Sequence, residues 1–288
     1  MPPARTTARL DGAPARDALL AELSARLTAA GNPSITLATV LVGDDGPSHT
    51  YVGNKRRTAA ALGLGSVHAE LAATATQAEV EAQVTALALD PSVHGILVQL
   101  PLPSHLDTER VLALIPADKD VDGLTTASMG RLMRGLRGHV SCTPLGVLRL
   151  LQHHGIETAG RRAVVVGRST LVGLPLSVLL ARRGIDCTVT LAHSRTDDLV
   201  DVCRTADILV SATGVARSIT ADHVTPGAVV VDVGISRTEQ GIVGDVDAAS
   251  VEGIASALTP MPGGTGLMTV ACLMENTVNA AAMQGVAV

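Results

Sequence analysis

One aromatic ring and one lysine stand four residues apart in the first third of the chain. Tyr51 is the only Phe, Trp or Tyr among 288 residues, and Lys55 follows it. On a helix, residues i and i+4 lie on one face, so the ring and the amine would point the same way. A ring can stack on a planar substrate, and an amine can move protons. We therefore predict that this pair forms a working surface.

Three strand-end segments of the first half could place proton-transfer groups together. These are the region around residues 44–51, Gln99 after an apolar run, and Asp122 in a polar loop. A lysine beside an amide and a carboxylate is a reasonable arrangement for moving a proton. Lys55 could instead be a surface lysine, and Asp122 could simply form the turn before Gly123. Spacing alone leaves both interpretations open.

A second segment has the features of a nucleotide-binding turn. Residues 164–173 read as strand, turn and helix, and Gly167 and Gly173 bracket the turn, with Ser169 where a G-x-G-x-x-G motif has its middle glycine. Such a turn brings backbone amides and a helix N-terminus to a diphosphate. We place the next strand at residues 187–191, and no acid follows it before Asp197.

The residues around these two strand ends indicate which dinucleotide the turn would bind. NAD sites usually end the second strand in an acid that binds the ribose 2′-hydroxyl. Here Arg168, Ser194 and Arg195 offer cations and a hydroxyl, which suit a 2′-phosphate. The sequence thus predicts NADP as the cofactor. The alternative is that the arginines are solvated loop charges.

The elements that would position these residues alternate between strands and helices. Such alternation predicts parallel sheets, and a helix beginning at Thr143, with Pro144 at its first position, marks the domain boundary. We predict an α/β fold of two α/β domains with a cleft between them, the second a Rossmann-like doubly wound parallel sheet. The first domain comprises residues 1–142, completed by a final helix in 267–288, and the second comprises 143–266. We expect strands at 35–42, 66–71, 95–98, 163–166, 187–191, 208–211 and 228–232, and helices at 15–30, 48–62, from 76, 108–114, 143–154, 172–183, 197–203 and 267–283.

Composition limits the class of protein further. Hydrophobic residues make up 47% and charged residues 17%, so the chain can bury a sizeable core, which must be aliphatic. A net charge of −5 and a single aromatic ring argue against a nucleic-acid partner. The polar N-terminus and the absence of long apolar runs predict a cytoplasmic protein without a membrane partner.

The cysteines, histidines and carboxylates give no sign of a metal site. The four cysteines show no C-x-x-C spacing and stand in apolar segments, which predicts buried thiols in a reducing compartment. No cluster has metal-ligand spacing, and His153 with His154 is expected to complement a helix end, so we predict no metal. The cysteines are Cys142, Cys187, Cys203 and Cys272.

Longer motifs carry a family resemblance. In order from about Leu10 to Asn276, the chain resembles the bifunctional methylenetetrahydrofolate dehydrogenase/cyclohydrolase (FolD) family. The matching segments are Gly43-Asp44-Asp45 with Ser48, Tyr51-Val52 and Lys55; residues 95–103, Gly-Ile-Leu-Val-Gln-Leu-Pro-Leu-Pro; Lys119-Asp120-Val121-Asp122-Gly123; Cys142-Thr143-Pro144; 166–169 with Val172-Gly173; 193–196; 232–234; 244–246; and 262–264 with Gly266, Met268 and Thr269.

The resemblance implies two activities and a role for each motif residue. One activity oxidises 5,10-methylenetetrahydrofolate to the 5,10-methenyl form with NADP, and the other hydrolyses the methenyl form to 10-formyltetrahydrofolate. Lys55 would be the catalytic lysine of hydrolysis, Gln99 would tune it, Asp122 would hold the pterin, and Tyr51 would stack on the aminobenzoate. The resemblance implies folate contacts by Val52, Val98, Leu100, Pro262, Gly263, Gly264 and Thr269, NADP contacts by Gly167, Arg168, Ser169, Ser194, Arg195 and Ile235, and a homodimer.

Departures from the family motifs leave alternatives. The usual Gly-Gly-Val-Gly-Pro reads Gly-Gly-Thr265-Gly-Leu267 here, and the residue before Cys142 is Ser141 rather than Pro. One alternative is an NADP-dependent methylenetetrahydrofolate dehydrogenase paralogue with weak or lost cyclohydrolase activity. A regulatory protein that binds NADP or folate, and an unrelated two-domain NADP oxidoreductase, are the others. Intact Lys55, Gln99 and Asp122 argue against the regulatory protein, and the Gln99 and Tyr51 segments argue against the unrelated oxidoreductase.

Overall fold

The computed structural model describes residues 6–44, 46–239 and 241–288. The chain divides into two compact units, and each combines separated stretches of sequence. Unit 1 comprises Met1–Asp17 and Thr143–Thr269, and unit 2 comprises Ala18–Cys142 and Val270–Val288. Helix α1 (Gly12–Ala29) begins in unit 1 and continues into unit 2.

The sheet of unit 2 has three parallel strands in the order β3-β2-β4. They are β2 (Thr36–Val42), β3 (Gly65–Leu71) and β4 (Gly95–Val98). Helix α2 (Gly46–Ala61) follows β2, and α3 (Gln77–Leu89) follows β3. Because β3 and β4 flank β2 on opposite sides, the chain reverses its direction across the sheet at β2, which creates a switch point at the carboxyl ends of β2 and β4.

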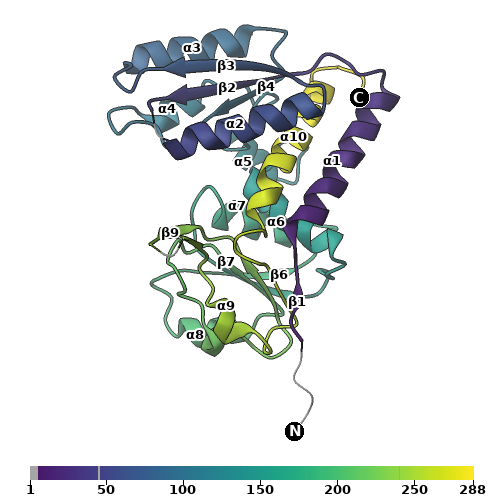
Figure 1. Cartoon of the computed structure of the whole chain (residues 1–288), viewed down its shortest axis with the longest axis vertical. Coiled ribbons are helices and arrows are strands. Elements are labelled where there is room, and N and C mark those ends of the chain that lie inside the picture. The colour runs from purple at the N-terminus through teal and green to yellow at the C-terminus, as the bar shows by residue number, and fades with distance from the viewer. Residues whose placement is uncertain (1–5, 45, 240) are drawn as a thin grey trace. The chain divides into compact units, whose positions relative to one another are not determined.

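The core of unit 2 lies on one face of this sheet. Alternate β2 residues Ala38, Val40 and Val42 join a buried cluster with side chains of α3 and of α4 (Thr108–Leu112). Since successive strand residues point to opposite faces, Thr39 and Leu41 point to the other face. Figure 1 shows α2 and α3 on opposite sides of the strands, so α2 covers this second face.

The sheet of unit 1 has six parallel strands in the order β1-β11-β8-β7-β5-β6. Their residues are largely β-branched and buried at the centre, as expected for a sheet covered on both faces. The strands are β1 (Ala8–Arg9), β5 (Arg162–Val166), β6 (Thr188–Ala192), β7 (Ile208–Ser211), β8 (Val229–Asp232) and β11 (Ala257–Leu258). The other elements are α6 (Cys142–His153), α7 (Gly173–Ala181), α8 (Leu199–Arg204), a short turn η1 (Ala221–His223), α9 (Ala248–Val251) and the antiparallel pair β9 (Ser236–Thr238) and β10 (Gly241–Val243).

The predicted α/β class with parallel sheets is confirmed, and most predicted elements lie within a few residues of their expected bounds. The capping box of Thr76 and Glu79 is present at the start of α3. All four cysteines are buried thiols, as predicted. Within the described ranges, no helix combines the length and apolar character needed to cross a bilayer.

Two helix starts were predicted wrongly, and several elements were missed. Helix α2 begins at Gly46, so Ser48 lies inside it, and α6 begins at Cys142, so Thr143 is not its N-cap. Sequence patterns did not indicate β1, β11, the β9–β10 pair or α5 (Thr126–Met133). The final helix, α10, spans Gly266–Met283, and its residues from Val270 onward belong to unit 2.

Gly123 is a position where this fold requires glycine. Its φ is +67°, and a Cβ built there would lie 2.6 Å from the Ser141 backbone nitrogen. Gly135 has a nearly identical φ of +65° with no atom within 4 Å of such a Cβ. Substituting alanine at both positions therefore distinguishes the cost of backbone strain, present at both, from the cost of steric overlap, present only at Gly123.

We predict that Gly123→Ala destabilises the protein more than Gly135→Ala. The left-handed conformation alone should cost Gly135→Ala about 1 kcal/mol. The overlap with Ser141 should add about 1–3 kcal/mol for Gly123→Ala. Urea unfolding followed by circular dichroism measures both variants. Equal losses would show that the turn adjusts freely to a side chain.

Candidate functional site

Lys55 is held in the interior of unit 2 by a hydrogen bond to Gln99. Its side chain lies on α2 and is only 9% exposed, and its Nζ donates to Gln99 Oε1 at 3.0 Å. The Gln99 amide nitrogen donates to the Leu100 carbonyl at 2.7 Å, which fixes the amide so that its oxygen faces the lysine. The Gln99 backbone nitrogen donates to Val40 O at 2.8 Å, so the site is tied to the switch point between β2 and β4.

Asp122 lies beside this pair. Asp120, two residues earlier, forms a parallel bridge with Ile96 of β4, so Asp122 comes level with the end of that strand. Burial raises the pKa of the Asp122 carboxyl, while the Lys55 ammonium and a hydrogen bond from Cys142 oppose that rise. The structure thus bonds Lys55 to Gln99 directly, and the Lys55 ammonium acts on the Asp122 carboxyl through space.

Two buried residues that sequence reasoning did not assign to the site support Asp122. Asn276 of α10 donates through Nδ2 to Val121 O at 2.8 Å and to Val140 O at 2.9 Å. Cys142 donates to the same Val121 carbonyl at 3.4 Å, and burial raises the pKa of its thiol well above the ordinary value. Cys142 is thus a neutral thiol. An amide side chain at a buried helix position is the signal that could have identified Asn276.

The remaining predicted folate residues of unit 2 differ in exposure. Tyr51 is on α2 with 43% of its surface exposed, so its ring is available to a ligand. Val52 and Val98 are buried, and Leu100 is half-buried. Tyr51 is therefore the residue of this group with the most surface left for contact, in keeping with the stacking role predicted for it.

The predicted folate loop of residues 262–264 belongs to unit 1. Gly263 O accepts a hydrogen bond from Gly12 N at 2.8 Å, and the Thr269 and Thr143 hydroxyl oxygens lie 3.4 Å apart. Thr265 is 2% exposed and donates its hydroxyl to Asp232 O at 2.9 Å. This bond anchors the loop to the end of β8.

The predicted nucleotide residues gather at one edge of the unit 1 sheet. Val166 of β5 is in register with Ala192 of β6 and with Ser211 of β7, so the carboxyl ends of these strands lie side by side. Chain order reverses at β5, with β6 on one side and β7 on the other, which is where doubly wound sheets bind ligands. After these strand ends come Gly167, Arg168 and Ser169 (β5), Ser194 and Arg195 (β6), and Ile235 (β8).

The turn after β5 has the features that a bound diphosphate requires. Gly167 has a φ of +127°, and a Cβ there would lie 2.1 Å from Ala212 O, so only glycine fits between β5 and β7. Ser169 holds the start of α7: its Oγ accepts from Val172 N at 3.1 Å, and its carbonyl accepts from Leu174 N at 3.0 Å. Arg168, Ser169, Ser194, Arg195 and Ile235 are all exposed at this edge.

Two buried carboxylates organise the same edge. Asp232 accepts hydrogen bonds from the backbone nitrogens of Gly234, Asp245 and Val246. Asp245 accepts from Ser211, and also from the amides of Thr213 and Gly214. Burial raises the pKa of Asp232 to about 6, although its backbone hydrogen bonds oppose that rise.

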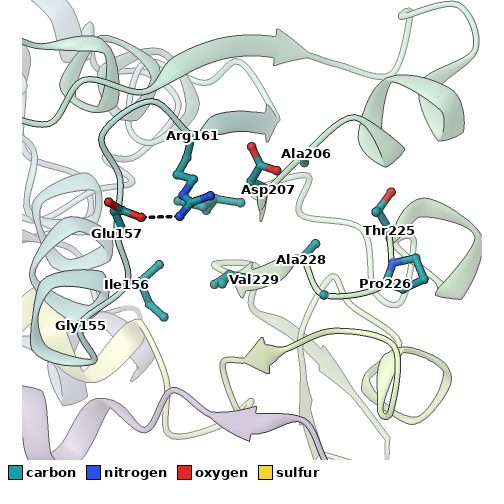
Figure 2. Close-up of a pocket in the computed structure, with 12 residues that line it drawn as sticks. Gly155, Ile156, Glu157, Arg161, Ala206, Asp207, Thr225, Pro226, Ala228 and Val229 are labelled. Carbon is teal, nitrogen blue, oxygen red and sulfur yellow. Dashed lines mark hydrogen bonds and ion pairs between the residues drawn. The ribbon is translucent and has the colours of Figure 1, made fainter. Parts of the chain in front are cut away.

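A cavity of about 390 Å³ opens at the opposite edge of this sheet. Figure 2 shows its lining, with Ala228 and Val229 near the start of β8, Asp207 just before β7, and Glu157 paired with Arg161. None of the predicted site residues lines it. The cavity therefore does not coincide with the edge where the nucleotide residues gather.

Family comparisons agree with this arrangement. Residues 10–122 match the catalytic-domain model of the tetrahydrofolate dehydrogenase/cyclohydrolase family, and residues 141–285 match its NAD(P)-binding-domain model. The chain belongs to this family. Bifunctional protein FolD 2 of Frankia alni is 53% identical over 245 residues, which cover 85% of this chain and 84% of that protein.

Solved structures extend the likeness to the fold. The FolD methylenetetrahydrofolate dehydrogenase/cyclohydrolase of Campylobacter jejuni has a TM-score of 0.92 at 40% identity, covering 96% of this chain and 99% of that one. A Trypanosoma brucei methylenetetrahydrofolate dehydrogenase-cyclohydrolase, solved with NADP and an inhibitor, has a TM-score of 0.90 at 36% identity, covering 98% and 99%. The predicted family is confirmed.

We predict that Asp232 makes stability depend on pH in a way that Asp232→Asn does not. The pKa of Asp232 is about 6 in the fold against 3.8 for an ordinary aspartate, so the folded state holds the extra proton between these values. The free energy of unfolding should therefore fall as pH rises from about 4 to about 6, by about 1.4 kcal/mol per pH unit.

Urea unfolding at several pH values, compared between wild type and Asp232→Asn, isolates this contribution because other groups cancel. Asp201→Asn, at an exposed carboxylate on α8, is the matched control and should follow the wild-type slope. If the free energy of unfolding changes with pH equally in wild type and in Asp232→Asn, the raised pKa is not that of Asp232.

Proposed function

We propose that this protein oxidises 5,10-methylenetetrahydrofolate to 5,10-methenyltetrahydrofolate with NADP, and then hydrolyses the product to 10-formyltetrahydrofolate. The observation that carries the proposal is the buried Lys55, bonded to Gln99 and next to Asp122, in a chain of the dehydrogenase/cyclohydrolase family. NADP supplies the hydride acceptor of the first step. The protein supplies binding sites and a proton carrier.

The residues of unit 1 fit a phosphorylated dinucleotide. Gly167 leaves room for close backbone approach at the turn that leads into α7, the place where a diphosphate binds in doubly wound sheets. Arg168 and Arg195 offer positive charge, and Ser194 a hydroxyl, for a 2′-phosphate, and no acid stands there to favour an unphosphorylated ribose. Ile235 and Ser169 complete the proposed contacts.

Lys55 is the proposed proton carrier of the hydrolytic step. Attack of water on the cationic methenyl carbon releases a proton, and ring opening requires a proton on the departing nitrogen. An amine held by a fixed amide oxygen can take the first proton and return the second. The Lys55–Gln99 contact therefore argues against the alternative of a dehydrogenase with weak or lost cyclohydrolase activity.

The proposed folate contacts divide the remaining residues by chemistry. The Asp122 carboxyl binds the polar edge of the pterin, and the exposed Tyr51 ring stacks on the aminobenzoate. Val52, Val98 and Leu100 shape the apolar wall, and Pro262, Gly263, Gly264 and Thr269 contribute from unit 1. The folate-binding domain would comprise residues 1–142 with 267–288, and the NADP-binding domain residues 143–266.

We further propose a cytoplasmic homodimer without nucleic-acid or membrane partners. The homodimer follows from the family resemblance. The net charge of −5 supports the absence of a nucleic-acid partner, because binding to phosphates requires a basic surface.

We predict that Lys55→Met abolishes hydrolysis while largely sparing oxidation. The rate of methenyltetrahydrofolate hydrolysis should fall by about 100-fold or more, since a positioned acid–base group contributes about 10²–10⁴. NADPH formation should fall far less, because hydride transfer does not use this proton. Arg56→Met removes an exposed cation from the next position of α2 and should leave both rates unchanged. Hydrolysis at the wild-type rate in Lys55→Met would disprove the role of the lysine.

We predict that Arg168→Ala and Arg195→Ala raise KM for NADP by about tenfold or more each, as expected for loss of a charge-assisted phosphate contact worth about 1.5–3 kcal/mol. KM for NAD should change little, because NAD has no 2′-phosphate. Arg161→Ala removes an arginine from the opposite edge of the same sheet and is the matched control. If the ratio of the two KM values stays at the wild-type value in both variants, neither arginine reads the phosphate.

A further inference from the structure

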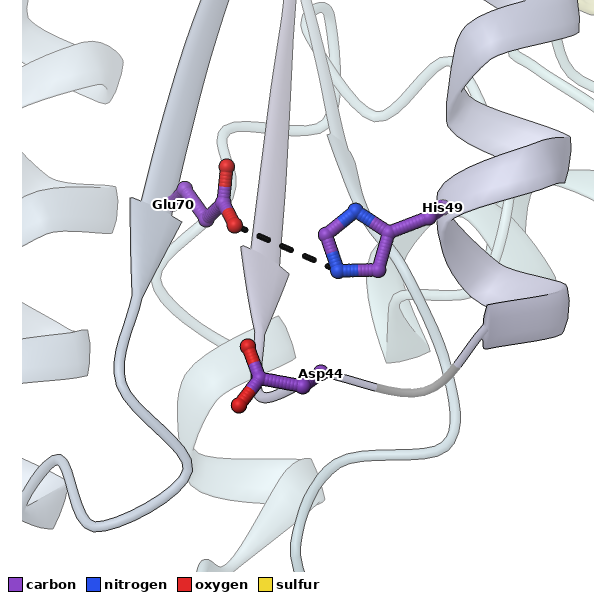
Figure 3. A group of neighbouring side chains, drawn as sticks. All are labelled: Asp44, His49 and Glu70. Atoms are coloured by element: carbon purple, nitrogen blue, oxygen red, sulfur yellow. Dashed lines mark ion pairs between the residues drawn. The ribbon is translucent and has the colours of Figure 1, made fainter.

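A histidine and two carboxylates meet on unit 2, outside the residues assigned to folate chemistry. Asp44 follows β2, His49 lies on the first turns of α2, and Glu70 lies near the end of β3. Their ligand atoms all lie within 4.8 Å of one another, and Figure 3 shows the three side chains converging from separate elements. His49 Nε2 is 4.0 Å from Glu70 Oε1.

A second imidazole lies against the same carboxylate. His68 Nε2 is 3.5 Å from the other oxygen of Glu70. His68 and Glu70 are two residues apart on β3, so they share one face of the strand. Thr39 of β2 is in register with His68, and Thr39 points to the face that α2 covers. The sheet and α2 therefore bring both imidazoles, of His49 and His68, to Glu70.

The hydrogen bonds of Thr39 orient His68. The Thr39 hydroxyl donates to Val67 O at 3.4 Å, and its oxygen lies 3.0 Å from His68 Nδ1. This contact fixes the imidazole so that Nε2 is directed at Glu70. Histidines that bind metals are typically held this way, with the second ring nitrogen bonded to a neighbouring group.

The side chains at this place carry the donor atoms of a mixed nitrogen and oxygen ligand set. A carboxylate attracts a cation, and the lone pair of an imidazole nitrogen can bind a metal ion. Two imidazoles flank Glu70, and the carboxylate of Asp44 adds further negative charge. The charge and the lone pairs at this place therefore both favour a positive ion.

We propose that Asp44, His49 and Glu70, with His68 as a fourth ligand, bind a divalent first-row transition ion of the Zn²⁺ type. Mixed imidazole and carboxylate ligands favour such ions over Mg²⁺ and Ca²⁺, which prefer oxygen alone. Bonds of about 2.0–2.2 Å require ligand atoms slightly closer together than those here. Asp44, His49 and Glu70 are exposed, so their side chains are free to close that distance.

Occupation of this site would tie the start of α2 to the edge strand β3. His49 precedes Tyr51 by two residues and Lys55 by six on the same helix. The site takes no part in the proposed folate chemistry, and its test does not depend on that function. Sequence reasoning predicted no metal site, because the residues proposed here come from three separate elements and have no common spacing.

Zn²⁺ titration of the untagged full-length protein by calorimetry tests the inference, with Co²⁺ absorption reporting nitrogen and oxygen ligands. Wild type should bind one Zn²⁺ saturably, and Mg²⁺ should not compete. His49→Gln and Glu70→Gln should abolish saturable binding. Thr39→Val, which keeps the shape but removes the hydroxyl that orients His68, should weaken binding by about tenfold. Circular dichroism checks that each variant is folded.

Two matched controls carry the same chemical changes elsewhere. Glu22→Gln alters an exposed carboxylate of α1, and His153→Gln alters an exposed imidazole next to His154. Both should bind Zn²⁺ as wild type does. Absence of saturable Zn²⁺ binding in wild type would overturn the inference. Wild-type affinity in folded His49→Gln and Glu70→Gln, or loss of binding in His153→Gln instead, would overturn it equally.

Discussion

The buried amine of Lys55 is the constraint on which the rest of unit 2 depends. An ammonium inside an aliphatic core is very costly unless it is paired. The partner is the Gln99 carboxamide, whose oxygen is aimed by the bond from its own amide to Leu100 O. Gln99 in turn is fixed by β2 through Val40 O. Strand register therefore positions the lysine that we propose as the proton carrier, and a slip of β4 against β2 would leave it without its acceptor.

Unit 1 positions its strand ends with carboxylates instead. Asp232 and Asp245 gather backbone amides from turns that follow β7, β8 and β10. The Asp232 carbonyl also receives the hydroxyl of Thr265, which anchors the loop that leads into α10. A valine at this position could not make that hydrogen bond.

The elements that sequence patterns predicted are those with local signals. Runs such as 35–42 and 163–166 are β-branched and end at glycine or polar turns, and Thr76 with Glu79 caps a helix within four residues. Strands β1 and β11 are two residues long and pair across most of the chain, so no local pattern marks them. The same limit applies to the site. Lys55 and Gln99 stand at predictable positions, whereas Asn276 acts on carbonyls that only the fold brings near.

Tyr51, the single aromatic residue of the chain, is not part of the aliphatic core. Leucine, valine, isoleucine and alanine fill both sheets' interiors, and they pack without help from aromatic side chains. With 43% of its surface exposed, Tyr51 adds little to that packing. A ring of this size left in solvent gains much more by covering a flat ligand than by remaining where it is. Its place one helical turn before Lys55 thus argues that α2 carries both the binding surface and the proton carrier.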